Sequence, residues 1–188
     1  MPSKVFNDSK DDYDFFYPKV FASYVLTIKA TSYRGQVNLL ATEIANLTKH
    51  LRYEHLIFLG DEKTPWLDKA SDYKSAMGGL EFLIANKVGK RFNGALLTDI
   101  ANLPTFIKHL TWLIRSNTLL PYVHFMDKGQ NIVGSICQYG NLHIDSLNKR
   151  ADRFLKDFVS TSQFDYVFDK RCSEKYSKTG IKGRQISV

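Results

Sequence analysis

The chain has 188 residues, of which 44% are hydrophobic and 24% are charged, and its formal net charge is +7. This length and composition exclude collagen-like, low-complexity and wholly disordered chains and predict one domain with a sizeable apolar core. Two cysteines, Cys137 and Cys172, are too few for a disulfide-rich secreted scaffold. No apolar run approaches the roughly 20 residues that span a bilayer, and the first residues are acidic, so we expect a cytoplasmic protein with no membrane partner.

The positive charge is concentrated at the C-terminal end of the chain. Residues 1–19 carry a net charge of −1, residues 20–169 carry +3 and residues 170–188 carry +5. We therefore divide the chain into an irregular lead-in (1–19), a single globular domain (20–169) and a flexible basic tail (170–188). Such a tail either contacts an acidic partner or only helps to keep the chain in solution.

Hydrophobic periodicity predicts helices and strands in alternation, followed by a meander. Apolar runs predict strands at 20–30, 55–60 and 94–100, and apolar residues at helical spacing predict helices at 37–51, 71–88 and 103–115. Two strands at 122–126 and 131–138 then flank a turn at Gly129, and a third strand is expected at 141–144. A last helix follows the capping residues Asp145 and Ser146, and an edge strand is expected at 164–168.

This order of elements predicts an α/β fold, with an α+β fold as the alternative. Strands that alternate with helices commonly pair in parallel through right-handed crossovers. We therefore expect a single mixed sheet with helices on both faces and with the antiparallel meander, near residues 121–144, added at one side.

Three of the predicted strands end in an aspartate, namely Asp61, Asp99 and Asp127. If these strands are parallel neighbours, the carboxylates line the sheet edge at which open α/β folds bind ligands. Several carboxylates at such an edge would hold Mg²⁺ and, through it, a phosphate group. The alternative interpretation is local, because an aspartate at a strand end also accepts hydrogen bonds from nearby backbone amides.

The segment around the first of these aspartates also resembles a known family. His55 to Pro65, HLIFLGDEKTP, is similar to the second-strand region of some GT-A-type glycosyltransferase-like proteins. The resemblance covers about eleven residues and implies that Asp61 lies near a nucleotide and Asp99 near a metal ion. The Asp-x-Asp motif of that family is absent, since residues 97–101 (LTDIA) contain one carboxylate.

Basic side chains form a stripe on the last predicted helix. Lys149, Arg153 and Lys156 are four and three residues apart, with Arg150 beside them. With the tail they form a candidate contact face for nucleic acid or an acidic protein, unless they only solvate the helix. The full candidate face is Lys149, Arg150, Arg153, Lys156, Lys170, Arg171, Lys175, Lys178, Lys182 and Arg184.

Trp66 follows Pro65 in a predicted loop and is a candidate aromatic contact residue. The alternative is that its ring packs as a lid on the edge of the sheet. The two possibilities differ in the exposure of the side chain.

The histidines and cysteines show no spacing typical of a zinc site, and the chain contains no P-loop, dinucleotide-binding or nucleophile-elbow motif. We therefore expect no catalytic residue, no metal and no cofactor, and we expect Cys137 to be a buried, inert thiol on a strand. His124 and His143 are expected on neighbouring strands of the meander.

These observations favour a non-enzymatic cytoplasmic binding protein, such as an inhibitor, an immunity-type protein or an adaptor, that engages an acidic macromolecular partner. One alternative is an enzyme, or a relic of one, that resembles nucleotide or nucleotide-sugar transferases and uses the edge formed by Asp61, Asp99 and Asp127. A second alternative is nucleic-acid binding through the last helix and the basic tail.

Overall fold

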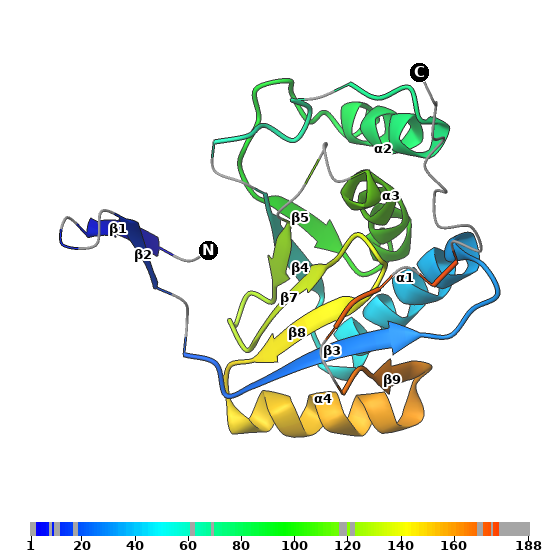
Figure 1. Ribbon diagram of the computed structural model, residues 1–188. Helices are drawn as coiled ribbons and strands as arrows, with labels where there is room; N and C mark the ends of the chain where they lie inside the picture. The colour runs from blue at the N-terminus through cyan, green and yellow to red at the C-terminus, as the bar shows by residue number, and fades with distance from the viewer. Residues whose placement is uncertain are drawn as a thin grey trace, which may run out of the picture.

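The computed structural model describes residues 3–7, 9, 12–16, 19–60, 63–68, 70–116, 120, 123–168, 171–173 and 175–176. These residues form one seven-stranded sheet, four helices and a separate two-stranded hairpin (Figure 1). The strands of the large sheet, in spatial order, are β5 (Leu96–Asp99), β4 (His55–Leu59), β6 (His124–Met126), β7 (Ile132–Ile136), β8 (Leu142–Ser146), β3 (Ala22–Ile28) and β9 (Phe164–Tyr166).

The helices and strands agree closely with the periodicity of the sequence. The helices are α1 (Tyr33–His50), α2 (Lys74–Ala85), α3 (Leu103–Arg115) and α4 (Lys149–Thr161). β1 (Ser3–Asn7) and β2 (Asp12–Phe16) form an antiparallel hairpin within the segment that we expected to be irregular. The expected α/β class and the edge strand β9 are confirmed. The expected β6–β7–β8 meander is present, but it lies in the middle of the sheet, between β4 and β3, and not at one side. None of the described helices is long and apolar enough to cross a membrane.

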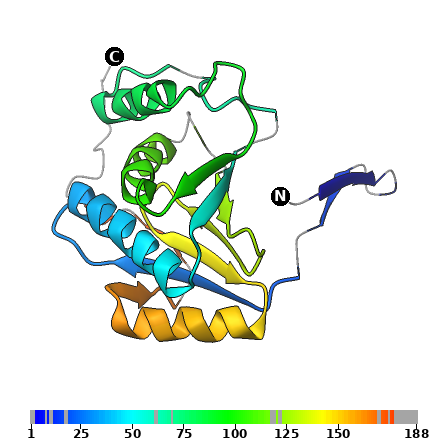
Figure 2. The same cartoon turned by 180° about the vertical axis from the view of Figure 1, so that it is seen from behind.

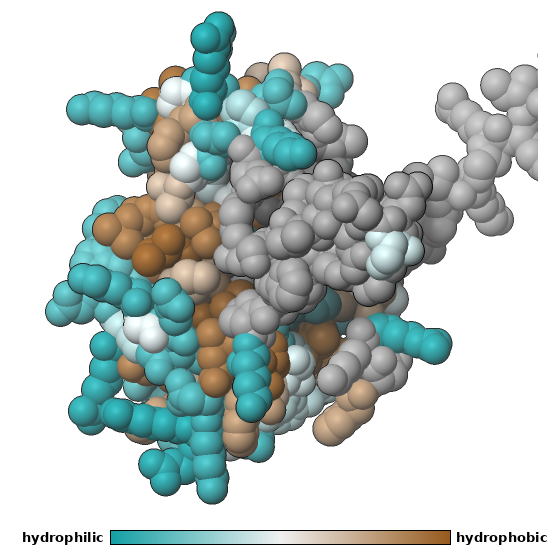
Figure 3. All heavy atoms as spheres, turned by 90° about the vertical axis from the view of Figure 1, so that its left-hand side faces the viewer, coloured by the Kyte–Doolittle hydropathy of each residue, from teal (hydrophilic) through white to brown (hydrophobic). Residues whose placement is uncertain are grey.

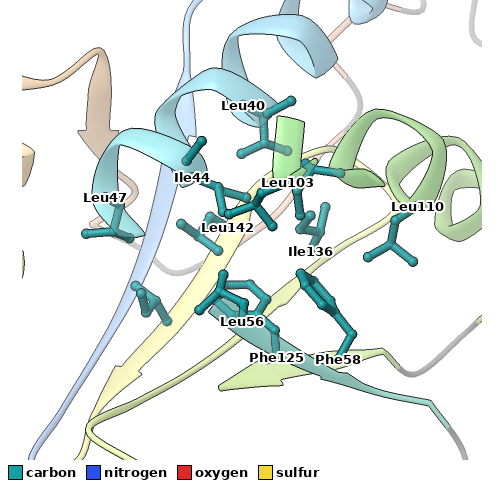
Figure 4. Close-up of a cluster of buried hydrophobic side chains, with 14 of the residues drawn as sticks. Leu40, Ile44, Leu47, Leu56, Phe58, Leu103, Leu110, Phe125, Ile136 and Leu142 are labelled. Atoms are coloured by element: carbon teal, nitrogen blue, oxygen red, sulfur yellow. The ribbon is translucent and has the colours of Figure 1, made fainter. Parts of the chain in front are cut away.

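One face of the sheet carries the hydrophobic core. Alternation along the strands turns Leu26, Phe58, Phe125 and Leu142 to the same side, where all four are buried. Side chains from all four helices belong to this one core, and Figure 4 shows part of it between α1, α3 and the sheet. Figure 2 shows the molecule from behind, with α1 and α3 in front of the sheet and α4 along its lower edge. The described helices therefore lie on one face, and not on both as we expected.

Strand pairing also differs from expectation, because every described pair in the large sheet is antiparallel. β5 and β6, which α3 connects, do run in the same direction, but β4 lies between them. β3 and β4, which α1 connects, are separated by β6, β7 and β8. The connections through α1 and α3 set the direction of the following strand without determining which strand lies next to it, and the connection through α2 leads into an antiparallel neighbour, since β5 pairs antiparallel with β4. The expected parallel neighbours are therefore absent from the described sheet.

The opposite face of the large sheet, called here the open face, is covered by no described helix. Side chains that alternate with the core residues point to it, among them Thr27, His124, Ser135 and His143, and they are half-buried. Figure 3 views the molecule from the side and shows hydrophilic side chains projecting at its upper and lower ends, with hydrophobic side chains gathered in a band between them.

A short part of the basic tail crosses the open face. This part, residues 171–173 and 175–176, is called here the C-terminal strap and appears orange-red in Figure 1. The Lys175 ammonium group donates a hydrogen bond to the hydroxyl of Thr27. The ring of Tyr176 lies 6.3 Å from that of Tyr33, edge to face. The described part of the tail is therefore docked on the domain.

Candidate functional site

The antiparallel sheet separates the ends of the strands that carry the predicted carboxylates. β5 and β6 both run antiparallel to β4, so Asp99 and Asp127 lie at the same end of the strands, where β5 and β6 finish. The chain leaves β4 after Leu59, at the opposite end of the strands. Asp61 itself lies outside the described residues. The parallel arrangement that would bring the three carboxylates to one edge is not present.

Asp99 connects the end of β5 to the start of α3. Its carboxylate accepts hydrogen bonds from the backbone N–H of Asn102 at 2.8 Å and from the Asn102 side-chain amide at 3.0 Å. These hydrogen bonds, the backbone one first, hold the pKa of Asp99 below its usual value. Both oxygens therefore take part in a local turn, as the alternative interpretation of the sequence expected.

Asp127 is fully buried and organises the hairpin turn between β6 and β7. Its Oδ1 accepts from the backbone N–H groups of Asn131 at 2.7 Å and Ile132 at 2.9 Å, and its Oδ2 accepts from the Asn131 amide at 2.9 Å. Tyr53 lies beside it, and burial together with the negative charge of Asp127 raises the pKa of Tyr53 to about 12. The carboxylate is thus committed to the turn.

Trp66 is a structural residue, which corrects its assignment as a candidate contact. The side chain is only 2% exposed. Its indole N–H donates to the carbonyl of Gly94 at 2.9 Å, and its ring lies against Gly60, where an added Cβ would be 3.4 Å from Cε2. A buried indole with a satisfied N–H links the loop after β4 to the segment before β5. The ring is therefore not available to a partner.

The four basic residues of α4 are all exposed, and one of them is paired with an acidic side chain. Lys149, Arg150 and Arg153 are exposed. Lys156 forms an ion pair with Asp152, with 2.9 Å between Nζ and Oδ2. Of the tail residues in the candidate face, Arg171 and Lys175 belong to the strap, and the others, Lys170, Lys178, Lys182 and Arg184, lie outside the described residues.

The start of α4 is fixed by a capping residue that also contacts the meander. Asn148 accepts a hydrogen bond from the backbone N–H of Ala151 at 2.9 Å. Its amide donates to the side-chain oxygen of Asn131 at 2.9 Å. Leu155 and Phe158 bury the opposite side of the helix in the core. This arrangement leaves the first basic residues of α4 on the surface, next to the end of α1.

A pocket of about 370 Å³ lies where α1 ends and α4 begins. Arg52 follows α1 in the left-handed region, with φ 61°, and its backbone N–H donates to the carbonyl of Lys49. Arg150 comes from the first turn of α4, and its guanidinium carbon lies 5.6 Å from the centre of the Phe154 ring. The lining residues are His50, Leu51, Arg52, Tyr53, Asn131, Arg150, Ala151 and Phe154.

The electrostatic character of this pocket is positive. Arg52 and Arg150 contribute two permanent charges, and none of the described residues that line the pocket is acidic. The amino-terminal end of α4 adds the partial positive charge of the helix dipole. Two described carboxylates contact lining residues from outside the pocket: Asp127 Oδ2 accepts from the Asn131 amide at 2.9 Å, and Asp157 Oδ2 lies 3.4 Å from Nε2 of His50. The pocket therefore offers guanidinium groups to an anion.

Only Arg150 of this pocket belongs to the face predicted from the sequence. Sequence reasoning missed His50, Arg52, Tyr53 and Asn131, because they come from two segments about 80 residues apart in the chain. The one local signal was the pair of basic residues, His50 and Arg52, around the end of an amphipathic helix. That pattern is also the ordinary complement of a helix dipole.

The open face brings together a second group of side chains that the sequence did not reveal. The Sγ atoms of Cys137 and Cys172 and a ring nitrogen of His143 all lie within 4.8 Å of one another. Burial raises the pKa of the Cys137 thiol to about 11 and lowers the pKa of His143. These three residues are the ones that could hold a metal ion among the residues that the structure describes.

Comparison of the chain with protein-family models, with curated proteins and with solved structures gave no match. The functional argument therefore rests on the geometry of the pocket and of the open face.

Proposed function

We propose that this protein is a non-enzymatic binding protein that holds an acidic group of a protein partner in the pocket between α1 and α4. The observation that carries the proposal is the convergence of Arg52 and Arg150 on one pocket with no acidic lining residue among those described. The exposed cations of α4 beside it, Lys149 and Arg153, extend the positive surface. These four residues, Arg52, Lys149, Arg150 and Arg153, are called here the α4 basic face.

The chemistry of the pocket suits a carboxylate or another oxyanion. A guanidinium group presents a planar fork of N–H donors that matches two oxygens of a carboxylate. Tyr53 also lines the pocket and carries a hydroxyl group, whereas the side-chain amide of Asn131 is already bonded to Asp127 and Asn148. A concave site of about 370 Å³ accommodates the end of an acidic side chain together with part of its backbone.

The shape and charge pattern favour a protein over a nucleic acid as the partner. Two acidic residues, Asp152 and Asp157, interrupt the positive charge of α4, and Asp152 neutralises Lys156. A phosphate backbone is bound best by a continuous array of cations, whereas a concave pair of arginines suits a single acidic group. An inhibitor, an immunity-type protein or an adaptor acting in the cytoplasm is the class of function that we infer.

The transferase-like alternative receives no support from the two carboxylates that the structure describes. Asp99 and Asp127 each accept two or more hydrogen bonds from their own turns. A Mg²⁺ ion bound there would have to compete with those bonds for the same oxygens. For this reason the proposal does not include an enzymatic step.

The test is the binding of a fluorescent poly-glutamate peptide to the full chain, measured by anisotropy at low ionic strength. The double variant Arg52→Glu, Arg150→Glu should weaken binding by roughly tenfold or more, since charge-assisted hydrogen bonds are lost. The matched control is Lys90→Glu, Arg91→Glu, which changes the net charge by the same amount. Lys90 and Arg91 lie in the exposed connection between α2 and β5. They are far from the pocket, because Figure 1 shows α2 and α4 at opposite ends of the molecule.

Two outcomes would overturn the proposal. Equal weakening by both double variants would show that the peptide senses only the net charge. Tighter binding of a single-stranded oligonucleotide than of the peptide, lost when residues 170–188 are removed, would favour the nucleic-acid alternative.

A further inference from the structure

Three donor atoms that suit a soft metal ion converge on the open face. Cys137 comes directly after β7, His143 lies on β8 and Cys172 lies on the C-terminal strap. Cys172 Sγ is 3.3 Å from His143 Nε2, and the donor atoms of all three residues lie within 4.8 Å of one another. Such separations are close to those between ligands that share one tetrahedral ion, given metal–ligand bonds of about 2.0–2.3 Å.

The fold of the meander fixes two of these donors. His143 pairs with Ser135 across β7 and β8, and the backbone N–H of Cys137 donates to the carbonyl of Asn141 at 3.1 Å. Strand alternation therefore turns the side chains of Cys137 and His143 to the same face. Cys137 lies two residues after Ser135, the direct partner of His143, so the two side chains are diagonal neighbours. The turn between them closes through Gly140, whose φ of +74° is readily adopted by glycine.

The strap brings in the third donor and is itself held in place. The hydroxyl of Thr27 donates to the side-chain oxygen of Asn141 at 2.8 Å and accepts from Lys175. The contact of Tyr176 with Tyr33 anchors the strap on α1. Cys172 is thereby positioned over β8 between residues of the sheet that are fixed by their own hydrogen bonds.

We propose that Cys137, His143 and Cys172 form a binding site for a divalent metal ion of the zinc class. Thiolate sulfur and imidazole nitrogen are the ligands that Zn²⁺ prefers, and three protein ligands leave one tetrahedral position for a further donor. When the ion binds, the two thiols lose their protons to solvent. The complex of the dication with two thiolates and one neutral imidazole then carries no net charge. The bound ion fastens the strap to the sheet.

A disulfide between the two cysteines is the competing chemistry. It would engage only the two sulfur atoms and leave the imidazole without a role, whereas all three donors converge here. Both cysteines are free thiols in the structure. The metal site therefore accounts for more of the geometry than a disulfide does.

The experiment is a Co²⁺ titration of the reduced, metal-free, untagged full chain, followed by absorption spectroscopy. We expect one equivalent of Co²⁺ to produce sulfur-to-cobalt charge-transfer absorption and the intense visible bands of four-coordinate cobalt, and Zn²⁺ to displace it. Cys172→Ser and His143→Asn should weaken binding beyond the roughly 10- to 100-fold that loss of an outer-shell partner costs. Cys172→Ser changes the strap alone, which keeps the test independent of the folding of the sheet.

The control is His124→Asn, which changes another half-buried histidine of the open face that lies outside the cluster. It should leave the cobalt spectrum and affinity unchanged. The proposal is overturned if wild-type protein does not bind Co²⁺ stoichiometrically, or if Cys172→Ser binds it as well as wild type does. It is also overturned if the chain purified without reductant contains a disulfide between the two cysteines, detected as a mass lower by two hydrogens and the loss of both free thiols.

Discussion

Asp152 is the residue through which α4 is fastened to two strands of the sheet. It is 5% exposed, and its Oδ1 accepts from the hydroxyl of Tyr24 at 2.6 Å and from that of Ser146 at 3.4 Å. Its Oδ2 pairs with Lys156. Burial by itself would raise the pKa of Asp152, but the hydrogen bonds from Tyr24 and Lys156 outweigh it and hold the pKa below its usual value.

This lowered pKa predicts a pH-dependent effect of Asp152→Asn. A group with a depressed folded-state pKa stabilises the fold above its unfolded pKa, near 3.8, and loses that contribution as pH falls through the folded value. The variant should therefore cost about 1–3 kcal/mol of unfolding free energy at neutral pH and progressively less at acidic pH, as the pH falls below 3.8. Urea unfolding at neutral and at acidic pH measures the difference. A cost that stays the same at both, or that exposed Asp157→Asn on the same helix reproduces, would contradict it.

A second prediction at this scale concerns Asp127, which the structure places in a turn and not at a ligand site. Asp127→Ala leaves the backbone N–H groups of Asn131 and Ile132 without their acceptor in a buried turn. The expected loss is about 3 kcal/mol of unfolding free energy, measured by chemical denaturation. A change below about 0.5 kcal/mol, as is usual for a surface substitution, would show that the carboxylate has no such structural role.

Helix α2 contains two adjacent glycines, Gly78 and Gly79, a residue type that weakens a helix interior. An added Cβ at Gly78 would meet no atom within 4 Å, whereas one at Gly79 would lie 2.8 Å from Cγ of Leu113 on α3. Gly79 therefore permits the close approach of α2 to α3, and Gly78 only weakens the helix.

The two glycines should respond to alanine with opposite signs. Gly78→Ala is expected to raise the unfolding free energy by about 0.5–1 kcal/mol through the better helix propensity of alanine. Gly79→Ala is expected to lower it by about 1–3 kcal/mol, because Leu113 must move. Thermal or urea unfolding of the pair provides the measurement, each variant serving as the control for the other. Destabilisation by both would mean that the packing of α2 differs from that described.

Most individual elements could be predicted because their signals are local. The helical spacing of Phe106, Leu110 and Leu113, with Pro104 in the first turn, predicted α3 with the bounds observed. The start of α4 was less accurate, since Asp145 and Ser146 were expected to cap it and Asn148 does so. Those two residues remain in β8 because β3 pairs with both of them and β7 continues alongside. Such pairing is made by distant segments and leaves no mark in the local sequence.

The order of the strands and the assembled sites depend on the whole molecule. The alternation of helices and strands predicted that strands joined by a helix share a direction, which holds for β5 and β6 but not for β4 and β5, and it did not predict that β4 lies between β5 and β6. The cluster of Cys137, His143 and Cys172 required the register of β7 and β8 and the path of the strap. No fixed spacing in the sequence marks it, unlike the short Cys-x-x-Cys spacing of many zinc sites.

The distribution of charge also has a different meaning at this scale. Most of the net charge of +7 lies in residues 170–188 of the sequence, yet the described pocket owes its charge to Arg52 and Arg150 of the globular domain. Arg171 and Lys175 of the tail lie on the strap that crosses the open face. The domain and the tail are therefore two separate sources of positive charge, and the proposed acidic partner has two candidate binding regions.

The measurement that separates these two sources most directly is a ¹H–¹⁵N correlation spectrum of the full chain, titrated with the poly-glutamate peptide. Binding in the pocket predicts that the largest saturable shift changes fall on Arg52, Tyr53, Asn131 and Arg150, and that Arg52→Glu with Arg150→Glu abolishes them. Saturable changes confined to residues 170–188, with those four signals unmoved, would contradict the account.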